Sequence, residues 1–395
     1  MPTQNNPATD NAAVSVIING KAHTDWSRYQ IDSDFLIPAD AWSVSLGLPD
    51  GKFPADVVRG APVTVKVGSD TVMTGRIDSV QRSVARSGVT LSLSGRDSAA
   101  ILVDCAAPIL TARQVGLEDV VAQIVRPLGI TKIRIEAESA IRSDKISAEP
   151  GERAWDMLLR ACAGRGLWPW FAPDGTLVIG GPDYTKQPVA SLVMRIDGTG
   201  NNVLSLSDAS SIDKSFSELT VLAQSHAHSA SGSSTAIVDV TDDTPINIDT
   251  DTGTAETGQH GMRAVVKDPT VNYYRPQVLV VGDADNQEQI NYRARKALAD
   301  AKLNGYSLTA IVYGHRTSDG VLWEPGQRIH VTSEYHGIDA VFFLMGREFS
   351  GGRPGGTTTT LRLKEDGVWI PDAYPKKKKQ RKRKGKGELA IVDVA

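Results

Sequence analysis

Two distant parts of the chain carry the same short β pattern, and this internal repeat constrains the fold more than any other feature. Each copy has an apolar-x-apolar strand, a Gly-Arg pair with a nearby serine, a Thr-Leu-x-Leu strand and an aspartate. The first copy comprises Val63, Val65, Gly75, Arg76, Ser79, Thr90, Leu91, Leu93 and Asp97. The second copy comprises Ile329, Val331, Gly346, Arg347, Ser350, Thr360, Leu361, Leu363 and Asp366. Two interpretations stay open: a duplicated β domain, or the chance recurrence of a short β motif with glycine.

Apolar and polar residues alternate in both copies, as half-buried strands require. In the first copy, for example, Val63, Val65 and Val67 alternate with Thr64 and Lys66. The sequence therefore predicts antiparallel β structure near both ends of the chain. If the repeat is a true duplication, three chains would present six similar domains in a ring. Such a ring suits a protein that lies between a six-fold and a three-fold partner.

Between the two copies, apolar residues recur at the spacing of a helical face. We expect helices at about 117–128, which ends at Pro127 and Gly129, at about 152–163, and at about 286–303. An Asp-Gly turn at 174–175 separates two short apolar runs, which predicts a hairpin over about 168–179. The first two helices and the hairpin together indicate a small α+β module.

A chain of 395 residues exceeds what one hydrophobic core usually serves. We predict a β-rich α+β fold with two antiparallel barrel-like domains, α+β insertions and a disordered basic C-terminal tail. The expected parts are a first β-barrel-like domain (1–110), an α+β insertion domain (111–204), a second, discontinuous β-barrel-like domain (205–228 and 305–370), an insertion with a long helix (229–304) and a basic flexible tail (371–395).

The composition is that of a soluble globular protein, with 41% hydrophobic and 23% charged residues. The first residues lack the basic start and apolar stretch of a secretory signal, and no window offers the ~20 apolar residues of a membrane span. We therefore expect a soluble protein made in the cytoplasm. Only Cys105 and Cys162 are present, so a disulfide framework or a cysteine metal site is not expected.

Patterns that carry chemistry were weighed against structural explanations. His226 and His228 could ligate a metal, but they lie in a Ser/Ala-rich stretch that favours a solvated loop. The glycine-rich run at 350–356 lacks the Lys-Ser/Thr of a phosphate-binding loop, and the aspartates of 239–251 do not follow EF-hand spacing. Glu152 and Asp156 lie one helical turn apart, a spacing common on any solvated helix face. We expect no catalytic residue, no metal and no cofactor.

Three segments carry a resemblance to a known family, in a consistent order over most of the chain. They are residues 63–106 (beginning VTVKVGSDTVMTGR), 149–179 (beginning EPGERAWDMLLR) and 306–331, with LWEPG ahead of the final strands. The chain resembles the baseplate hub proteins of Mu-like contractile-tailed phages, the tail P protein family, which is related to the hubs of contractile injection systems.

The resemblance implies a structural, non-enzymatic protein of the virion tail baseplate that is assembled in the bacterial host cytoplasm. It implies a homotrimer whose paired barrel domains form a pseudo-six-fold ring between the tail tube protein and the central spike protein. DNA or a tape-measure protein in the lumen is a further candidate partner. A small-molecule substrate is not expected.

A block of positive charge near the C-terminus stands outside that resemblance. It comprises Lys376, Lys377, Lys378, Lys379, Arg381, Lys382, Arg383, Lys384 and Lys386. Without these nine cations, 34 basic residues face 46 acidic ones, a balance of −12. Such a block is typical of a disordered segment that contacts phosphates or acidic proteins, although a solubility tail is an alternative. DNA in the lumen, the spike, and an acidic surface of its own trimer are all candidate partners.

Two other functions stay open at this point. One is a cell-wall-degrading enzyme of the baseplate, which would use a carboxylate such as Glu152. The other is a nucleic-acid-binding protein that acts through its basic tail.

Overall fold

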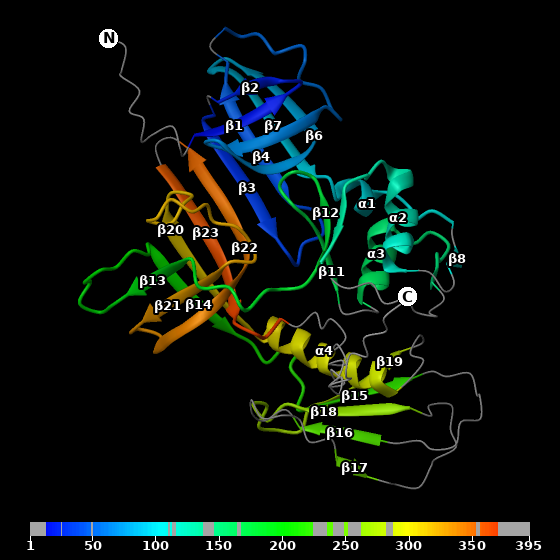
Figure 1. Cartoon of the computed structure of the whole chain (residues 1–395). Helices are drawn as coiled ribbons and strands as arrows, with labels where there is room; N and C mark the ends of the chain where they lie inside the picture. The colour runs from blue at the N-terminus through cyan, green and yellow to red at the C-terminus, as the bar shows by residue number, and fades with distance from the viewer. Residues whose placement is uncertain are drawn as a thin grey trace, which may run out of the picture.

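The computed structural model of the chain is a β-rich assembly with few helices (Figure 1). It describes residues 13–24, 26–48, 50–109, 111–112, 116–136, 146–163, 167–223, 235–239, 249–251, 262–281, 287–352 and 356–369. The fold falls within the predicted β-rich α+β class. The predicted tail lies outside the described residues.

Thirteen strands of the described residues form one sheet. Those from the first part of the chain are β1 (Val14–Ile18), β2 (Lys21–His23), β3 (Arg28–Asp34), β4 (Ala41–Gly47), β5 (Pro62–Val67), β6 (Asp70–Ala85) and β7 (Gly88–Asp97). Those from the later part are β13 (Ala190–Met194), β14 (Ser205–Ser210), β20 (Tyr306–Tyr313), β21 (Arg328–Ser333), β22 (Ile338–Gly352) and β23 (Gly356–Glu365).

Six strands of the first part and six of the later part are arranged in the same way. Their spatial orders are β1-β5-β6-β7-β4-β3 and β13-β21-β22-β23-β20-β14. In each set the members follow one another along the chain in the same succession, and four of the five pairings are antiparallel in both. The exception is that β1 pairs antiparallel with β5, whereas β13 pairs parallel with β21. The repeat seen in the sequence thus extends to the topology.

The Gly-Arg pairs that drew attention to the repeat do not occupy equivalent positions in the two ladders. Arg76 pairs with Arg96, ahead of a β-bulge in β6, whereas Arg347 pairs with Leu361, after the bulge in β22. The two glycines are also needed for different reasons. A Cβ on Gly75 would overlap the backbone oxygen of Arg96, and one on Gly346 would overlap the side chain of Asp34.

The two sets of strands join along β3 and β22. The first half of β22 pairs with β21, and residues 346–352 then pair with β3 over Asp34 to Arg28. Both sets contribute to one hydrophobic core, in which Ile31, Trp42 and Leu93 lie with Phe349 and Leu363. In the residues described, the strand path stays open at β14 and β2.

A second module, with its own core, follows the first strands. It contains α1 (Ala100–Asp104), β8 (Thr111–Ala112), α2 (Leu117–Val125), a 3-10 turn (Arg126–Leu128), β9 (Ile133–Ile135), β10 (Ile146–Ser147), α3 (Ala154–Ala163), β11 (Trp168–Phe171) and β12 (Leu177–Gly180). Gly129 (φ +86°) ends the α2 region, and Gly175 (φ +80°) lies in the turn between β11 and β12. The predicted helices and hairpin are confirmed, although α3 begins at Ala154 and so leaves Glu152 outside it.

A third module lies between β14 and β20 in the chain. It is a five-stranded sheet of β15 (Glu218–Ala223), β16 (Thr235–Asp239), β17 (Asp249–Asp251), β18 (Arg263–Lys267) and β19 (Pro276–Val281), with α4 (Gln287–Gly305). Ile290, Ala294 and Leu298 of α4 pack on Val221 and Val266. The predicted third helix is thereby confirmed as α4.

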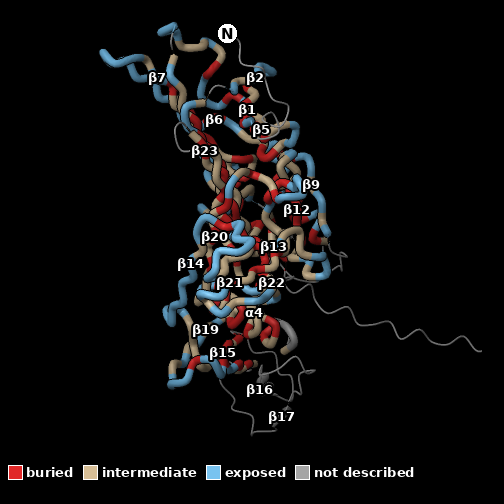
Figure 2. Tube along the Cα trace, turned by 90° about the vertical axis from the view of Figure 1, so that its left-hand side faces the viewer, coloured by how far each residue is buried: buried red, intermediate tan, exposed pale blue. Residues whose placement is uncertain are grey.

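Figure 2 shows buried residues running through the length of the molecule, with an exposed arm projecting where β6 and β7 meet. Within the described part of the chain, none of the helices has both the length and the apolar composition to cross a membrane. The residue ranges of the predicted domains stay a prediction.

Candidate functional site at the junction of the β regions

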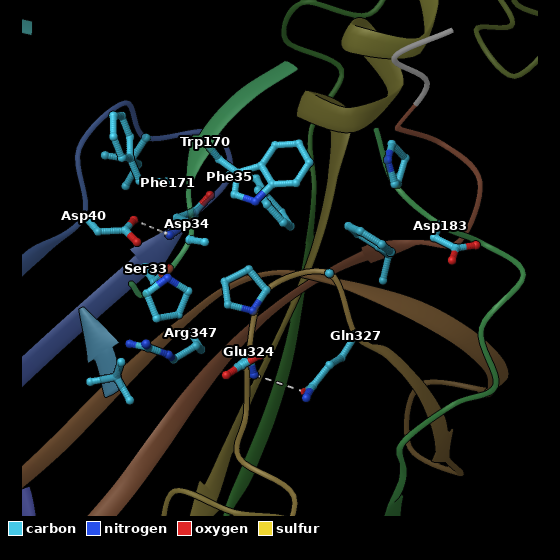
Figure 3. Close-up of a pocket in the computed structure, with 18 of the residues that line it drawn as sticks. Ser33, Asp34, Phe35, Asp40, Trp170, Phe171, Asp183, Glu324, Gln327 and Arg347 are labelled. Carbon is cyan, nitrogen blue, oxygen red and sulfur yellow. Dashed lines mark hydrogen bonds between the residues drawn. The ribbon is translucent and has the colours of Figure 1, made fainter. Parts of the chain in front are cut away.

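A cavity of about 560 Å³ lies where the two sets of strands meet the α+β module (Figure 3). Its walls come from the connection between β3 and β4, from the β11–β12 hairpin and the loop after it, and from residues 324–328. Asp34, Asp40, Asp97, Glu324 and Arg347 line it. Charged side chains therefore gather at the junction of three parts of the fold.

Two carboxyl groups, Asp40 and Asp97, share one wall of the cavity. Asp40 Oδ1 accepts a hydrogen bond from the backbone N of Asp34 (3.0 Å), and Asp97 Oδ1 accepts one from the backbone N of Ala99 (3.0 Å). Burial raises the pKa of Asp40 to about 6. Burial and the neighbouring Asp40 raise the pKa of Asp97 well above its usual range. A carboxyl group with a raised pKa keeps its proton, and so remains a hydrogen-bond donor, at a higher pH than usual.

Arg347 lies in the same wall with only 2% of its surface exposed. Its Nη1 donates to the backbone oxygen of Ile31 (3.0 Å), and its guanidinium carbon lies 4.0 Å from the centre of the Phe349 ring. Burial lowers its pKa to about 10, against the opposing effect of Asp40 and Asp32. Arg347 thus holds β22 to β3 through its hydrogen bond to Ile31, while its cation–π contact with Phe349 lies within β22.

Further polar contacts cross the same β3–β22 join. Arg362 of β23 forms ion pairs with Asp32 and Asp34 of β3, the latter at 2.8 Å. Tyr29 Oη lies 2.7 Å from His315 Nε2, and His315 Nδ1 lies 3.1 Å from Thr359 Oγ1. Burial lowers the pKa of His315 to about 4, and the positive charge of the nearby Arg347 contributes in the same direction. The imidazole is therefore neutral at pH 7.

Aromatic side chains fix the α+β module to the sheet. Trp168 Nε1 donates to the backbone oxygen of Phe35 (2.6 Å), and the Phe35 ring lies edge-to-face with Trp170 at 5.3 Å. Tyr184 Oη donates to the backbone oxygen of Trp369 (2.5 Å). These contacts bury large apolar surface while each polar end keeps a partner, which makes the junction rigid.

The chemistry of the cavity is that of a structural joint. Asp40 and Arg347 hydrogen-bond backbone atoms of β3, and Asp34 pairs with Arg362 of β23. Among the described residues, no group of three or more His, Cys, Asp and Glu could hold a metal ion. The arrangement provides polar contacts between the two strand sets and the α+β module.

The residues singled out from the sequence are placed as follows. The nine cations of 376–386, together with His226 and His228, lie outside the described residues. Glu152 accepts from Arg160 through both carboxylate oxygens, at 2.8 Å and 2.9 Å, and Asp156 is exposed on α3. Glu152 and Asp156 are therefore not a pair on one helix, and Glu152 is occupied by an ion pair.

Sequence reasoning missed the junction as a site. In the sequence, Arg347 and Asp97 stand out only as members of the β repeat, and no pattern marks Asp40. The available signal was a charged residue, Arg347, at a strand position flanked by apolar residues that point to the core. Such a residue must find a buried partner.

Four family models match successive parts of the chain. They describe the N-terminal domain of Mu phage baseplate assembly proteins like GpP (13–97), the second domain of baseplate hub proteins like gp44 (99–181), the third domain of tail proteins like NMB1110 (250–298) and a tail protein C-terminal domain (300–368).

Individual relatives agree with these models. The chain is 23% identical to baseplate hub protein gp44 of Escherichia phage Mu over 85% of its own length and 82% of that protein. A tail protein from Neisseria meningitidis MC58, known from its crystal structure, is 42% identical in sequence to this chain. The two structures superpose with a TM-score of 0.76 over 92% of this chain and 99% of that one. A 43 kDa tail protein of prophage MuSo2 from Shewanella oneidensis has the same fold, at 21% identity and a TM-score of 0.73 over 91% and 99%.

A relative at 42% identity over nearly its whole length leaves little room for a different assignment, and the matched models agree with the resemblance in the sequence. The chain belongs to the family of Mu-like phage tail proteins that form the baseplate hub.

Proposed function

We propose that the chain is the structural hub of a contractile-tail baseplate, in which three copies form a ring between the six-fold tail tube and the three-fold spike. The observation that carries this proposal is the presence of two strand sets with the same order in each chain. Three chains then supply six similar β units, while the rest of each chain repeats only three times. A ring of this kind can match both symmetries at once.

In this proposal the two strand sets act as the two barrel-like units, with the α+β modules between and beside them. The role is mechanical: sheath contraction drives the hub and spike through the host envelope, and the hub must keep its shape under load. The ion pairs and aromatic contacts at the junction support this, because they tie the two strand sets and the α+β module together within one chain. The role requires no catalytic residue, cofactor or small-molecule substrate. Assembly would take place in the bacterial cytoplasm.

The oligomeric state tests this proposal. Light scattering after size exclusion should give the mass of three chains of 42.3 kDa each, unchanged on dilution through the micromolar range. A monomer at every concentration, also after mixing with purified tail tube protein and spike, would contradict the proposal. The enzyme hypothesis would then come first, although the ion pair of Glu152 with Arg160 does not favour it.

The nine cations of 376–386 are proposed as an interaction segment that contacts polyanions in the tail lumen. Removing residues 371–395 should abolish salt-dependent DNA binding, because the remaining chain carries an excess of negative charge. A matched control replaces the nine cations by glutamine and keeps the length. DNA affinity that survives in both variants would place the DNA-binding surface in the body of the protein instead.

A further inference from the structure

Strand β22 is long enough to join the two strand sets. The strands equivalent to the two sides of this join, β6 and β14, each have an edge without a partner in the described chain. Residues 338–343 of β22 pair with β21 of its own set, and residues 346–352 continue past β21 to pair with β3 of the other set. Because the two sets have the same order, β6 is the equivalent of β22, and β14 is the equivalent of β3.

Strand β6 repeats the first half of this arrangement. Residues 70–76 of β6 pair with β5, as residues 338–343 of β22 pair with β21. Beyond them, residues 79–85 pair with β7 on one side, and the structure describes no strand on their other side. All but one of these seven residues are exposed, and 74% of the Val84 surface is accessible. This is part of the projecting arm in Figure 2.

Strand β14 repeats the other half. It is the terminal strand of the 13-stranded sheet and pairs only with β20 in the described chain. Five of its six residues are exposed, and the sixth, Leu206, is partly buried against the core. Its equivalent, β3, has strands on both sides, β4 and β22. Among the described strands, residues 79–85 of β6 and strand β14 are therefore two unpaired edges of the kinds that meet at the β3–β22 join.

We infer that residues 79–85 of β6 pair antiparallel with β14 of a neighbouring copy, so that the join within each chain is repeated between chains. The inference rests on the proposed ring of three. An exposed strand edge favours pairing with another chain, and two different edges on one chain give a head-to-tail interface that can close into a ring. Three internal joins and three joins between chains would then alternate around six β units.

The β-bulges give the register of this pairing. The bulge of β6 lies between Ile77 and Ser79, and that of β22 lies between Leu344 and Gly346. When the two bulges are taken as equivalent, Ser83 corresponds to Ser350. The pairings followed across each strand set then make Ser207 the equivalent of Gln30. The observed pair of Ser350 with Gln30 therefore corresponds to Ser83 opposite Ser207 of the neighbouring copy. Side chains that are directly opposite in an antiparallel pair lie on the same face.

This register brings complementary side chains together. Val84 comes opposite Leu206 of the neighbouring copy, which covers an exposed valine with the partly buried leucine. Arg82 comes opposite Asp208 of the neighbouring copy, an opposite-charge pair. The register follows from the bulges and the backbone pairings, without reference to these side chains, so the two matches are independent support for it.

Cysteine cross-linking tests the pairing directly. We expect Ser83→Cys with Ser207→Cys to give a covalent trimer on mild oxidation, because opposite residues bring their Cβ atoms within disulfide range. The matched control is Ser83→Cys with Ser210→Cys, where the second cysteine lies three residues further along β14, on its other face. Oxidised wild type shows the background from Cys105 and Cys162.

The outcomes separate this pairing from the ring itself. A reduced protein that is trimeric by light scattering, yet does not cross-link through the 83/207 pair, would overturn the pairing and leave the ring intact. Cross-linking of the 83/210 control as efficient as that of the 83/207 pair would also overturn it. A monomer that does not cross-link would overturn both proposals.

A charge exchange provides a second, independent readout. Arg82 also donates to the backbone oxygen of Val57 (2.8 Å), so Arg82→Glu alone could act within its own chain. We expect Arg82→Glu to lose the trimer peak at concentrations where the wild type keeps it, and the double variant Arg82→Glu/Asp208→Arg to regain it. Asp208→Arg also removes the ion pair of Asp208 with His336 in its own chain (3.7 Å), so the single variant Asp208→Arg is the control. Loss without recovery, where Asp208→Arg alone keeps the chain folded, would contradict the contact between Arg82 and Asp208, because a purely local effect at Val57 is not reversed by a change at residue 208.

Discussion

At the scale of single residues, burial at the junction shifts the pKa values of acidic and basic groups in opposite directions. It raises the pKa values of Asp40 and Asp97 and lowers those of His315 and Arg347. The carboxyl groups and the histidine thus respond oppositely to acid. Below neutral pH, protonation of Asp40 and Asp97 favours the folded state, whereas protonation of His315 opposes it.

The contribution of His315 to stability should disappear in acid. Its pKa is about 4 in the folded chain and about 6.5 when exposed, so the unfolded state binds more protons between these values. The contribution is complete above pH 6.5 and falls by at most about 3 kcal/mol as the pH drops to 4. Urea unfolding of wild type and His315→Asn across pH 4–8 measures it. If the unfolding free energy fell equally with decreasing pH in the two proteins, the prediction would be contradicted.

Asp97→Asn should stabilise the protein at alkaline pH. The asparagine oxygen can still accept from the backbone N of Ala99, and a buried negative charge beside Asp40 is removed. For an acid with a raised folded pKa, stability is lost as the pH rises through that value, and the variant escapes this loss. We expect a gain of about 1 kcal/mol at pH 8 that vanishes near pH 4. A variant less stable than wild type at pH 8 would show that the Asp97 charge is needed.

The sequence could indicate these residues but not their partners. Arg347 and Asp97 belong to the repeated pattern, yet Arg347 contacts Ile31, 316 positions away. Such a contact depends on the register between two strands that no local pattern determines.

At the scale of elements, the spacing of apolar residues predicts the helices and the hairpin, because local contacts determine these elements. The helices α2, α3 and α4 and the hairpin β11–β12 each bury one face, and their spacing is visible in the sequence. The start of α3 was misplaced by two residues. Glutamate is common in helices, but Glu152 lies before α3, and its carboxylate accepts hydrogen bonds from Arg160. The pairing of β3 with β22 could not be predicted, because more than 300 residues separate the two strands.

The β3–β22 join should depend on the ion pairs of Arg362. Asp34 has only 9% of its side chain exposed, and burial raises its pKa although Arg362 acts in the opposite direction. Arg362→Ala would leave this carboxyl group with only the backbone N of Leu36 as a donor and without its charged partner, at a cost of about 2 kcal/mol. The control is Arg134→Ala, whose exposed pair with Glu136 should contribute about 0–1 kcal/mol. Equal losses in urea unfolding would show that the join does not depend on Arg362.

At the scale of the whole molecule, the repeat in the sequence corresponds to two strand sets with the same topology. Strand order is shared between the two sets, while the Gly-Arg pairs that suggested the duplication lie at different ladder positions. The two sets also share a sheet and a core, and the bounds of the two predicted barrel-like domains stay a prediction. Hydrophobic alternation fixes which face of a strand is buried, but not which strand lies next to it.

The central claim is that three chains supply six similar β units around one axis. Electron microscopy of the purified full-length protein, viewed along that axis, tests it most directly. The account predicts closed rings of six similar lobes whose peripheral features repeat three times. Rings with another number of lobes, open chains, or single particles the size of one chain would contradict it.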